Sequence, residues 1–89
     1  MLNSLSPQIL LKRMQALEPF RGSDDQDVTS WLTDLEELFD TAQQTPEERL
    51  TIVPMYLVDD AKQWYRIHRS YNSWSDFKNA FVHSFTSLV

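Results

Sequence analysis

The clearest pattern in the chain is a run of apolar residues at helical spacing between Val28 and Ala42. Acidic and other polar residues fill the positions between them, which predicts a helix with one packed side and one charged side. The preceding letters "SDDQ" predict its start, with Ser23 and Gln26 as a capping box and aspartates near the positive end of the helix dipole. The apolar positions are Val28, Trp31, Leu32, Leu35, Leu38, Phe39 and Ala42.

A second helix is predicted to begin at "TPEE", where Thr45 is the cap, Pro46 is the first helical residue and Glu48 completes a capping box. Pro54 lies inside the run that follows and removes a main-chain hydrogen bond, so we expect a kink or an early end there. The apolar face of this run consists of Leu50, Val53 and Leu57.

Two more helices are predicted in the C-terminal half. The aspartates of "VDD" suit a new N-terminus, and helical spacing then continues to about Arg69. A Ser-x-x-acid cap, "SWSD", opens the last helix at Ser73. The apolar stripe of the third helix is Ala61, Trp64, Tyr65 and His68, and that of the last is Trp74, Phe77, Phe81, Phe85 and Leu88.

The N-terminal segment predicts a short helix from Ser6 and Pro7 to Leu17, because the residue before a proline is disfavoured in helical conformation. The letters "EPFRG" then predict an extended stretch in which Phe20 points inward and Gly22, the only glycine, allows a turn with positive φ. No segment has the alternation of a strand. The sequence therefore predicts an all-α fold, a compact bundle of four to five short helices.

The composition is that of one globular domain. The 89 residues are 42% hydrophobic and 24% charged, and their net charge is −5. No apolar run approaches the ~18 residues that a membrane span requires. The absence of cysteine excludes disulfides and thiolate metal sites, and the N-terminus lacks the features of a signal peptide. We expect a cytoplasmic domain without a membrane span.

The charges are unevenly distributed along the chain. Nine acidic side chains and no basic one lie between Asp24 and Glu48, whereas four basic side chains and one acidic side chain lie between Ala61 and Lys78. Nucleic-acid binding depends on a concentrated cationic field, which four dispersed cations in an acidic domain do not supply. We therefore expect no direct nucleic-acid binding.

No pattern indicates an enzyme. Asp25, Asp27 and Glu36 match three offsets of a calcium-binding EF-hand loop, but the glycine of that loop is missing and the stretch carries a helical stripe. His68 and His83 stand in no metal-binding motif, and one glycine cannot make a phosphate-binding loop. We expect no catalytic residue, no cofactor and no metal.

Four motifs follow one another between Pro19 and Phe85: "PFRG", "WLTDLE", "LVDDAKQWY" and "WSDFKNAF" with a further Phe. In this order and spacing they resemble the Gag capsid N-terminal lobe of gypsy-type long-terminal-repeat retrotransposons and the related Arc capsid N-lobe. Members of that family often carry glycine where this chain has Asp59 and Asp60. The resemblance implies a retroviral-capsid-like lobe over residues 19–89, preceded by an N-terminal helical extension over residues 1–18.

The resemblance also implies a function. Gag capsid lobes assemble into oligomeric shells, usually with a second helical lobe and a basic nucleocapsid region downstream, so we expect a single structural lobe that associates with itself. In that association, acidic surface of the first long helix would face basic surface of a neighbouring copy. The residues expected to contribute are Lys62, Arg66 and Arg69 on the basic side, and Leu10, Leu11 and Met14 in the N-terminal helix.

The alternative is a monomeric adapter that binds short linear peptides, as the resemblance to the Arc N-lobe implies. By alignment, the apolar groove of that lobe corresponds here to Trp31, Leu38, Tyr56 and Val58. Trp31 and Leu38 also belong to the stripe of the first long helix, so a packing role is the competing interpretation for both.

Overall fold

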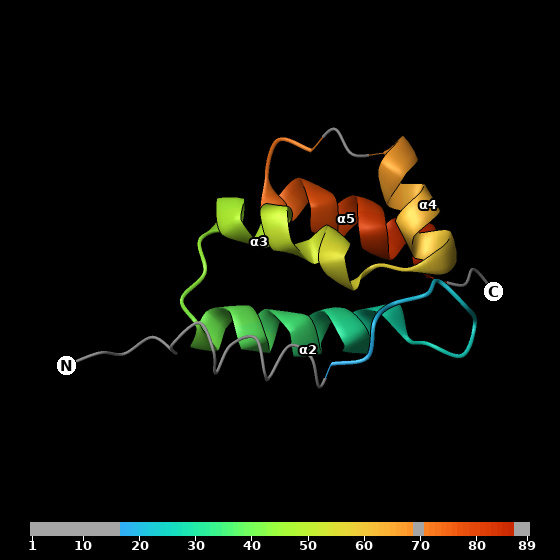
Figure 1. Cartoon of the computed structure of the whole chain (residues 1–89), viewed down its shortest axis with the longest axis horizontal. Coiled ribbons are helices and arrows are strands. Elements are labelled where there is room, and N and C mark those ends of the chain that lie inside the picture. The colour runs from blue at the N-terminus through green and yellow to red at the C-terminus, as the bar shows by residue number, and fades with distance from the viewer. Residues whose placement is uncertain (1–16, 69–70, 87–89) are drawn as a thin grey trace.

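The computed structural model describes residues 17–68 and 71–86. In these ranges the chain is all-helical without a strand, which confirms the predicted fold class. The elements are α2 (Val28–Thr41), α3 (Pro46–Ile52), a 3₁₀ helix η1 (Val53–Tyr56), α4 (Asp59–Ile67) and α5 (Trp74–Phe85). Figure 1 shows α2 along one side of the molecule, with α3, η1 and α4 across from it and α5 behind them. None of the helices in the described ranges combines the length and apolarity needed to cross a membrane.

The start of α2 corrects one prediction. The helix begins at Val28, and its cap is Asp27, whose side chain accepts a hydrogen bond from the Thr29 amide at 3.1 Å. Ser23 does not cap the helix. Gln26 instead ties down the segment before the helix, because its side chain accepts from the Arg21 amide at 2.7 Å and donates to the Pro19 carbonyl at 2.8 Å.

The other local signals are confirmed. Thr45 and Glu48 form a reciprocal capping box at α3, with Pro46 in the first turn. Pro54 ends the α-helical hydrogen bonding, and the chain continues as η1. Ser73 caps α5 by accepting from the Asp76 amide at 3.0 Å. Short helices with strong caps therefore begin where the sequence places them.

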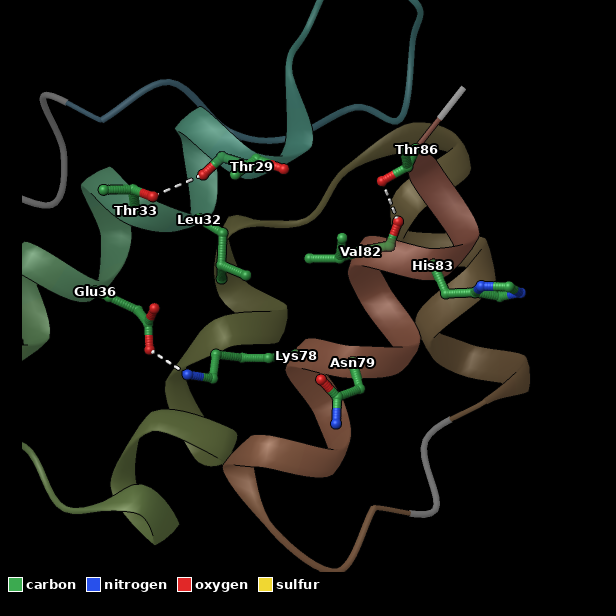
Figure 2. Close-up of a pocket in the computed structure, with 9 residues that line it drawn as sticks. All are labelled: Thr29, Leu32, Thr33, Glu36, Lys78, Asn79, Val82, His83 and Thr86. Carbon is green, nitrogen blue, oxygen red and sulfur yellow. Dashed lines mark hydrogen bonds and ion pairs between the residues drawn. The ribbon is translucent and has the colours of Figure 1, made fainter. Parts of the chain in front are cut away.

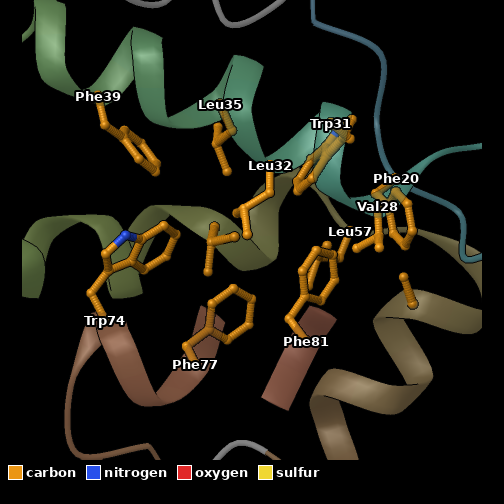
Figure 3. Packing of buried hydrophobic residues seen from close by; sticks show 12 residues of the cluster. Phe20, Val28, Trp31, Leu32, Leu35, Phe39, Leu57, Trp74, Phe77 and Phe81 are labelled. Atoms are coloured by element: carbon orange, nitrogen blue, oxygen red, sulfur yellow. The ribbon is translucent and has the colours of Figure 1, made fainter. Parts of the chain in front are cut away.

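The core is a row of rings on α5, covered by apolar side chains of α2 and η1. Phe77 stacks on Trp74 and on Phe81, with centroid distances of 5.2 Å in each pair. Figure 3 shows the side chains of α2 directed toward these rings. Trp64, predicted as a core residue, is half-buried and packs against the edge of this row. The fully buried side chains of the largest volume are Phe20, Leu35, Phe39, Val53, Leu57, Phe77 and Phe81.

The segment before α2 is held by both its side chain and its backbone. Phe20 is 1% exposed and lies 5.1 Å from Phe81 between ring centroids. Its amide donates to the Tyr56 carbonyl at 2.8 Å, and its carbonyl accepts from the Val58 amide at 3.0 Å. Gly22 then turns with a φ of +84°, and a Cβ there would lie 2.9 Å from a ring carbon of Phe85. Only glycine fits this turn without a shift of its neighbours.

The first residue of α4 is an aspartate at a position where the resembling sequences often have glycine. Asp59 has a φ of 52°, in the left-handed region that favours glycine. This is one of the two positions where the resembling sequences often have glycine. Aspartate tolerates this region better than most residues, so it can occupy this turn.

We expect Phe81→Ala to lower the free energy of unfolding by about 3–5 kcal/mol, because it removes a fully buried ring and leaves a cavity. Asn79→Ala, an exposed position on the same helix, is the control and is expected to change stability by less than about 0.5 kcal/mol. Urea denaturation followed by tryptophan fluorescence measures both. Equal midpoints for the two variants would contradict the assignment of the core.

Candidate functional site

A shallow groove runs between α2 and α5, with a volume of about 580 Å³ (Figure 2). Leu32 of α2 and Val82 of α5 point toward one another across it. Two of the three threonine hydroxyls on its borders are used within their own helices: Thr33 donates to the Thr29 carbonyl at 2.9 Å, and Thr86 donates to the Val82 carbonyl. The groove therefore combines apolar surface with polar side chains such as Asn79 and His83.

One end of this groove is closed by a network around the Glu36 carboxylate. Lys78 lies 3.0 Å from it, and the Trp74 indole N–H donates to it at 3.0 Å. The Arg49 guanidinium lies 3.9 Å from the same oxygen and 2.7 Å from Asp40. One half-buried carboxylate thus connects α2, α3 and α5.

The two histidines lie apart from this network. His68 is the C-cap of α4, where its ring stacks on Trp64 at 5.4 Å and its Nδ1 lies 3.0 Å from the Trp64 carbonyl oxygen. His83 is exposed on α5. In the described part of the chain, no three histidine or carboxylate side chains gather as a metal site would require.

The stretch with EF-hand spacing is not a loop. Asp25 lies in the turn before α2, Asp27 is its cap, and Glu36 lies well inside the helix. The uninterrupted helix confirms that the helical stripe outweighs the calcium-loop spacing.

The residues predicted for a peptide groove have separate surroundings. Trp31 is 6% exposed, and its indole N–H donates to the Glu18 carbonyl at 2.6 Å. It borders a small hollow beside Glu18 that Leu38, Tyr56 and Val58 do not line. Leu38 and Tyr56 are half-buried against the core. Packing therefore accounts for Trp31, and the peptide-groove role of the four remains a hypothesis.

Two of the residues predicted for self-association can be placed. Lys62 donates to the Pro54 carbonyl at 2.6 Å, so its ammonium connects α4 to η1. Arg66 is exposed and donates to the Gln63 side chain at 3.2 Å. The other predicted contact residues, Leu10, Leu11, Met14 and Arg69, lie outside the described residues, as does Leu88.

Two exposed apolar residues were missed by the sequence analysis. Met55 is 70% exposed and Ile67 is 74% exposed, and they are the large apolar side chains most open to solvent in the described ranges. A signal for Ile67 was available, since it falls off the apolar stripe of its helix. Met55 follows Pro54 in the 3₁₀ turn, where α-helical spacing no longer assigns a face.

Comparison with known proteins agrees with this geometry. Residues 15–86 match the family model of the retrotransposon-derived protein PEG10, N-terminal capsid-like domain. The chain belongs to this family. No match was found among curated proteins or among solved structures. The N-terminal capsid-like domain is a structural family and not an enzyme family, which agrees with the predicted absence of an active site.

Tyr71 carries a buried polar group in this capsid-like domain. It lies between α4 and α5, 5.3 Å from the Phe77 ring, and its buried hydroxyl has no hydrogen-bond partner among the described residues. Burial, with a smaller contribution from nearby Tyr65, raises the pKa of Tyr71 to about 12. Burial also raises the pKa of Tyr56.

We expect Glu36→Gln to lower the free energy of unfolding by about 1–2 kcal/mol, because hydrogen bonds to charged groups contribute more than neutral ones. Glu37→Gln is the matched control, since Glu37 is exposed beside it on α2, and should change stability by less than about 0.5 kcal/mol. Urea denaturation at low and high salt measures the difference. Equal losses in the two variants would show that the network does not stabilise the fold.

We expect Tyr71→Phe to make stability less sensitive to alkaline pH. The unfolded tyrosine ionises near pH 10, whereas folded Tyr71 stays neutral until about pH 12. Its contribution is therefore complete below pH 10 and is lost as the pH rises toward 12. Urea midpoints across this range should fall less in the variant than in the parent, although Tyr56 leaves some loss. Identical pH profiles would count against a buried, neutral hydroxyl.

Proposed function

We propose that this domain is an assembly lobe, which associates with further copies of itself as part of a particle built by a gypsy-type or domesticated Gag protein. The observation that carries the proposal is the match of residues 15–86 to a capsid-like domain family. The lobe itself is acidic, which argues against direct RNA binding by it.

Charge supports this association. The outer face of α2 exposes Asp34 and Glu37, and α3 exposes Glu47, all without a basic partner among the ion pairs of the described residues. Arg66 is exposed on α4. Acidic and basic surfaces on different elements of one molecule favour contact between unlike faces of two copies, which extends into rings or open lattices.

The adapter alternative has less support. A groove around Trp31 would have to form beside a ring that is already packed against Phe20 and Phe81. The open groove between α2 and α5 is a different surface from the one that the alignment with the Arc N-lobe implies.

We expect the weight-average mass of the domain to rise with concentration between the micromolar and millimolar ranges, because self-association follows mass action. Sedimentation equilibrium measures the mass, and added salt should lower it by screening the charged surfaces. A monomer at every concentration and at low salt would contradict the proposal.

A further inference from the structure

A second hollow, between α4 and α5, has the features of a contact site. Its volume is about 420 Å³, and it is lined by Trp64, Ile67, His68, Tyr71 and His83 with two small residues of α5. Among the described residues, no carboxylate lines it. The hollow therefore combines aromatic walls with an edge that is neutral to basic.

The outer face of α4 continues this surface. Gln63, Arg66 and Ile67 fall at i, i+3 and i+4 on the exposed side of the helix. Ile67 belongs both to this face and to the rim of the hollow. We name the hollow together with Arg66 and Ile67 the α4 face.

The α4 face is poorly suited to pairing with a second α4 face. A two-fold contact would bring the Arg66 side chains of both copies together, and like charges across an interface are unfavourable. The occupant should therefore carry acidic groups beside an apolar side chain.

The chain offers such an occupant along α3 and η1, with acidic side chains at the start of α3 and a methionine in η1. Met55, 70% exposed, is the other large apolar side chain open to solvent in the described part of the chain. Glu47 and Glu48 are exposed on the preceding helix. We name Met55 and these glutamates the Met55 ridge. A methionine side chain adapts to irregular hollows, and its sulfur makes favourable contacts with aromatic rings such as Trp64 and Tyr71.

The ridge and the α4 face are separate surfaces of one molecule. Met55 lies in η1, just before the first turn of α4. The Lys62 ammonium of α4 donates to the Pro54 carbonyl and so connects the two elements. Ile67 is the last residue of that helix, roughly 12 Å further along at 1.5 Å per residue. In Figure 1 this end of α4 points away from α2. A copy can therefore present its ridge to one neighbour and its α4 face to another.

We infer that the Met55 ridge of one copy docks on the α4 face of the next, with Met55 entering the hollow and Glu47 facing Arg66. This inference rests on the proposed self-association and names its surfaces. The sequence predicted that the acidic face of α2 would contact the basic surface of a neighbouring copy. In this inference the acidic residues of α3 take that place. The contact is between unlike faces, so it propagates from copy to copy.

The first test removes the apolar contacts. Met55→Ser and Ile67→Ser should each weaken association by about ten-fold or more in the dissociation constant, because each removes apolar area from the contact. Both residues are exposed, so thermal melts should show that the variants stay folded. If the parent associates and both variants associate equally well, the inference is wrong and the proposed function stands.

The second test exchanges charges. Arg66→Glu and Glu47→Arg should each weaken association when alone, and an equimolar mixture of the two should recover it, because each variant then meets its complement. Glu37→Arg on α2 is the matched control, because Glu37 and Glu47 have similar surroundings. The main-chain carbonyl of each accepts a hydrogen bond from the threonine hydroxyl four residues later in its helix. Loss with Glu37→Arg but not with Glu47→Arg would overturn the inference in favour of α2. A parent that is monomeric throughout would overturn both proposals.

Discussion

The fold depends on the burial of three aromatic rings of α5 beneath other elements. Trp74, Phe77 and Phe81 stack along one side of a helix of 12 residues and are almost completely buried. A helix of this length is marginal in water by itself, so it is stable only while other elements cover its rings. α2 covers them from one side, and Val53 and Leu57 lie in the same buried cluster. Phe20 packs against the end of the row, which explains why an extended segment before α2 is part of the core and not a linker.

Local signals in the sequence predicted most of the helices because their caps are made within a few residues of the helix they start. Thr45 and Ser73 use side chains and amides three residues away, so no tertiary contact is needed. The Ser23 cap does not form because the Ser23 hydroxyl donates to the Asp25 carboxylate and the Gln26 side chain is bound elsewhere. Gln26 makes its bonds to the segment before it, and this segment must reach Tyr56 and Val58, more than thirty residues later. A local pattern cannot show that a side chain is already used by such a contact.

The surfaces were predicted less well, for a related reason. The charge count along the chain correctly separates an acidic part from a basic part, but it does not show which charges are already paired. Glu36 is joined to Lys78 and Trp74, about forty residues away, and Lys62 bonds a main-chain carbonyl. These contacts remove two residues from the free surface. The 3₁₀ turn after Pro54 exposes Met55 by interrupting the α-helical spacing on which the prediction of faces depends.

Most large apolar side chains are used in the core, and this limits how a lobe of this family can associate. Almost every large ring is used to hold five short helical segments together, and this leaves two strongly exposed large apolar side chains in the described ranges. One such side chain and a few charges can supply only a weak contact, since stable interfaces between two proteins bury far more surface. Weak contacts become effective when one molecule makes several of them at once, because each contact raises the effective concentration for the next. Weak, repeated contacts of this kind would serve the proposed role, in which many copies act together.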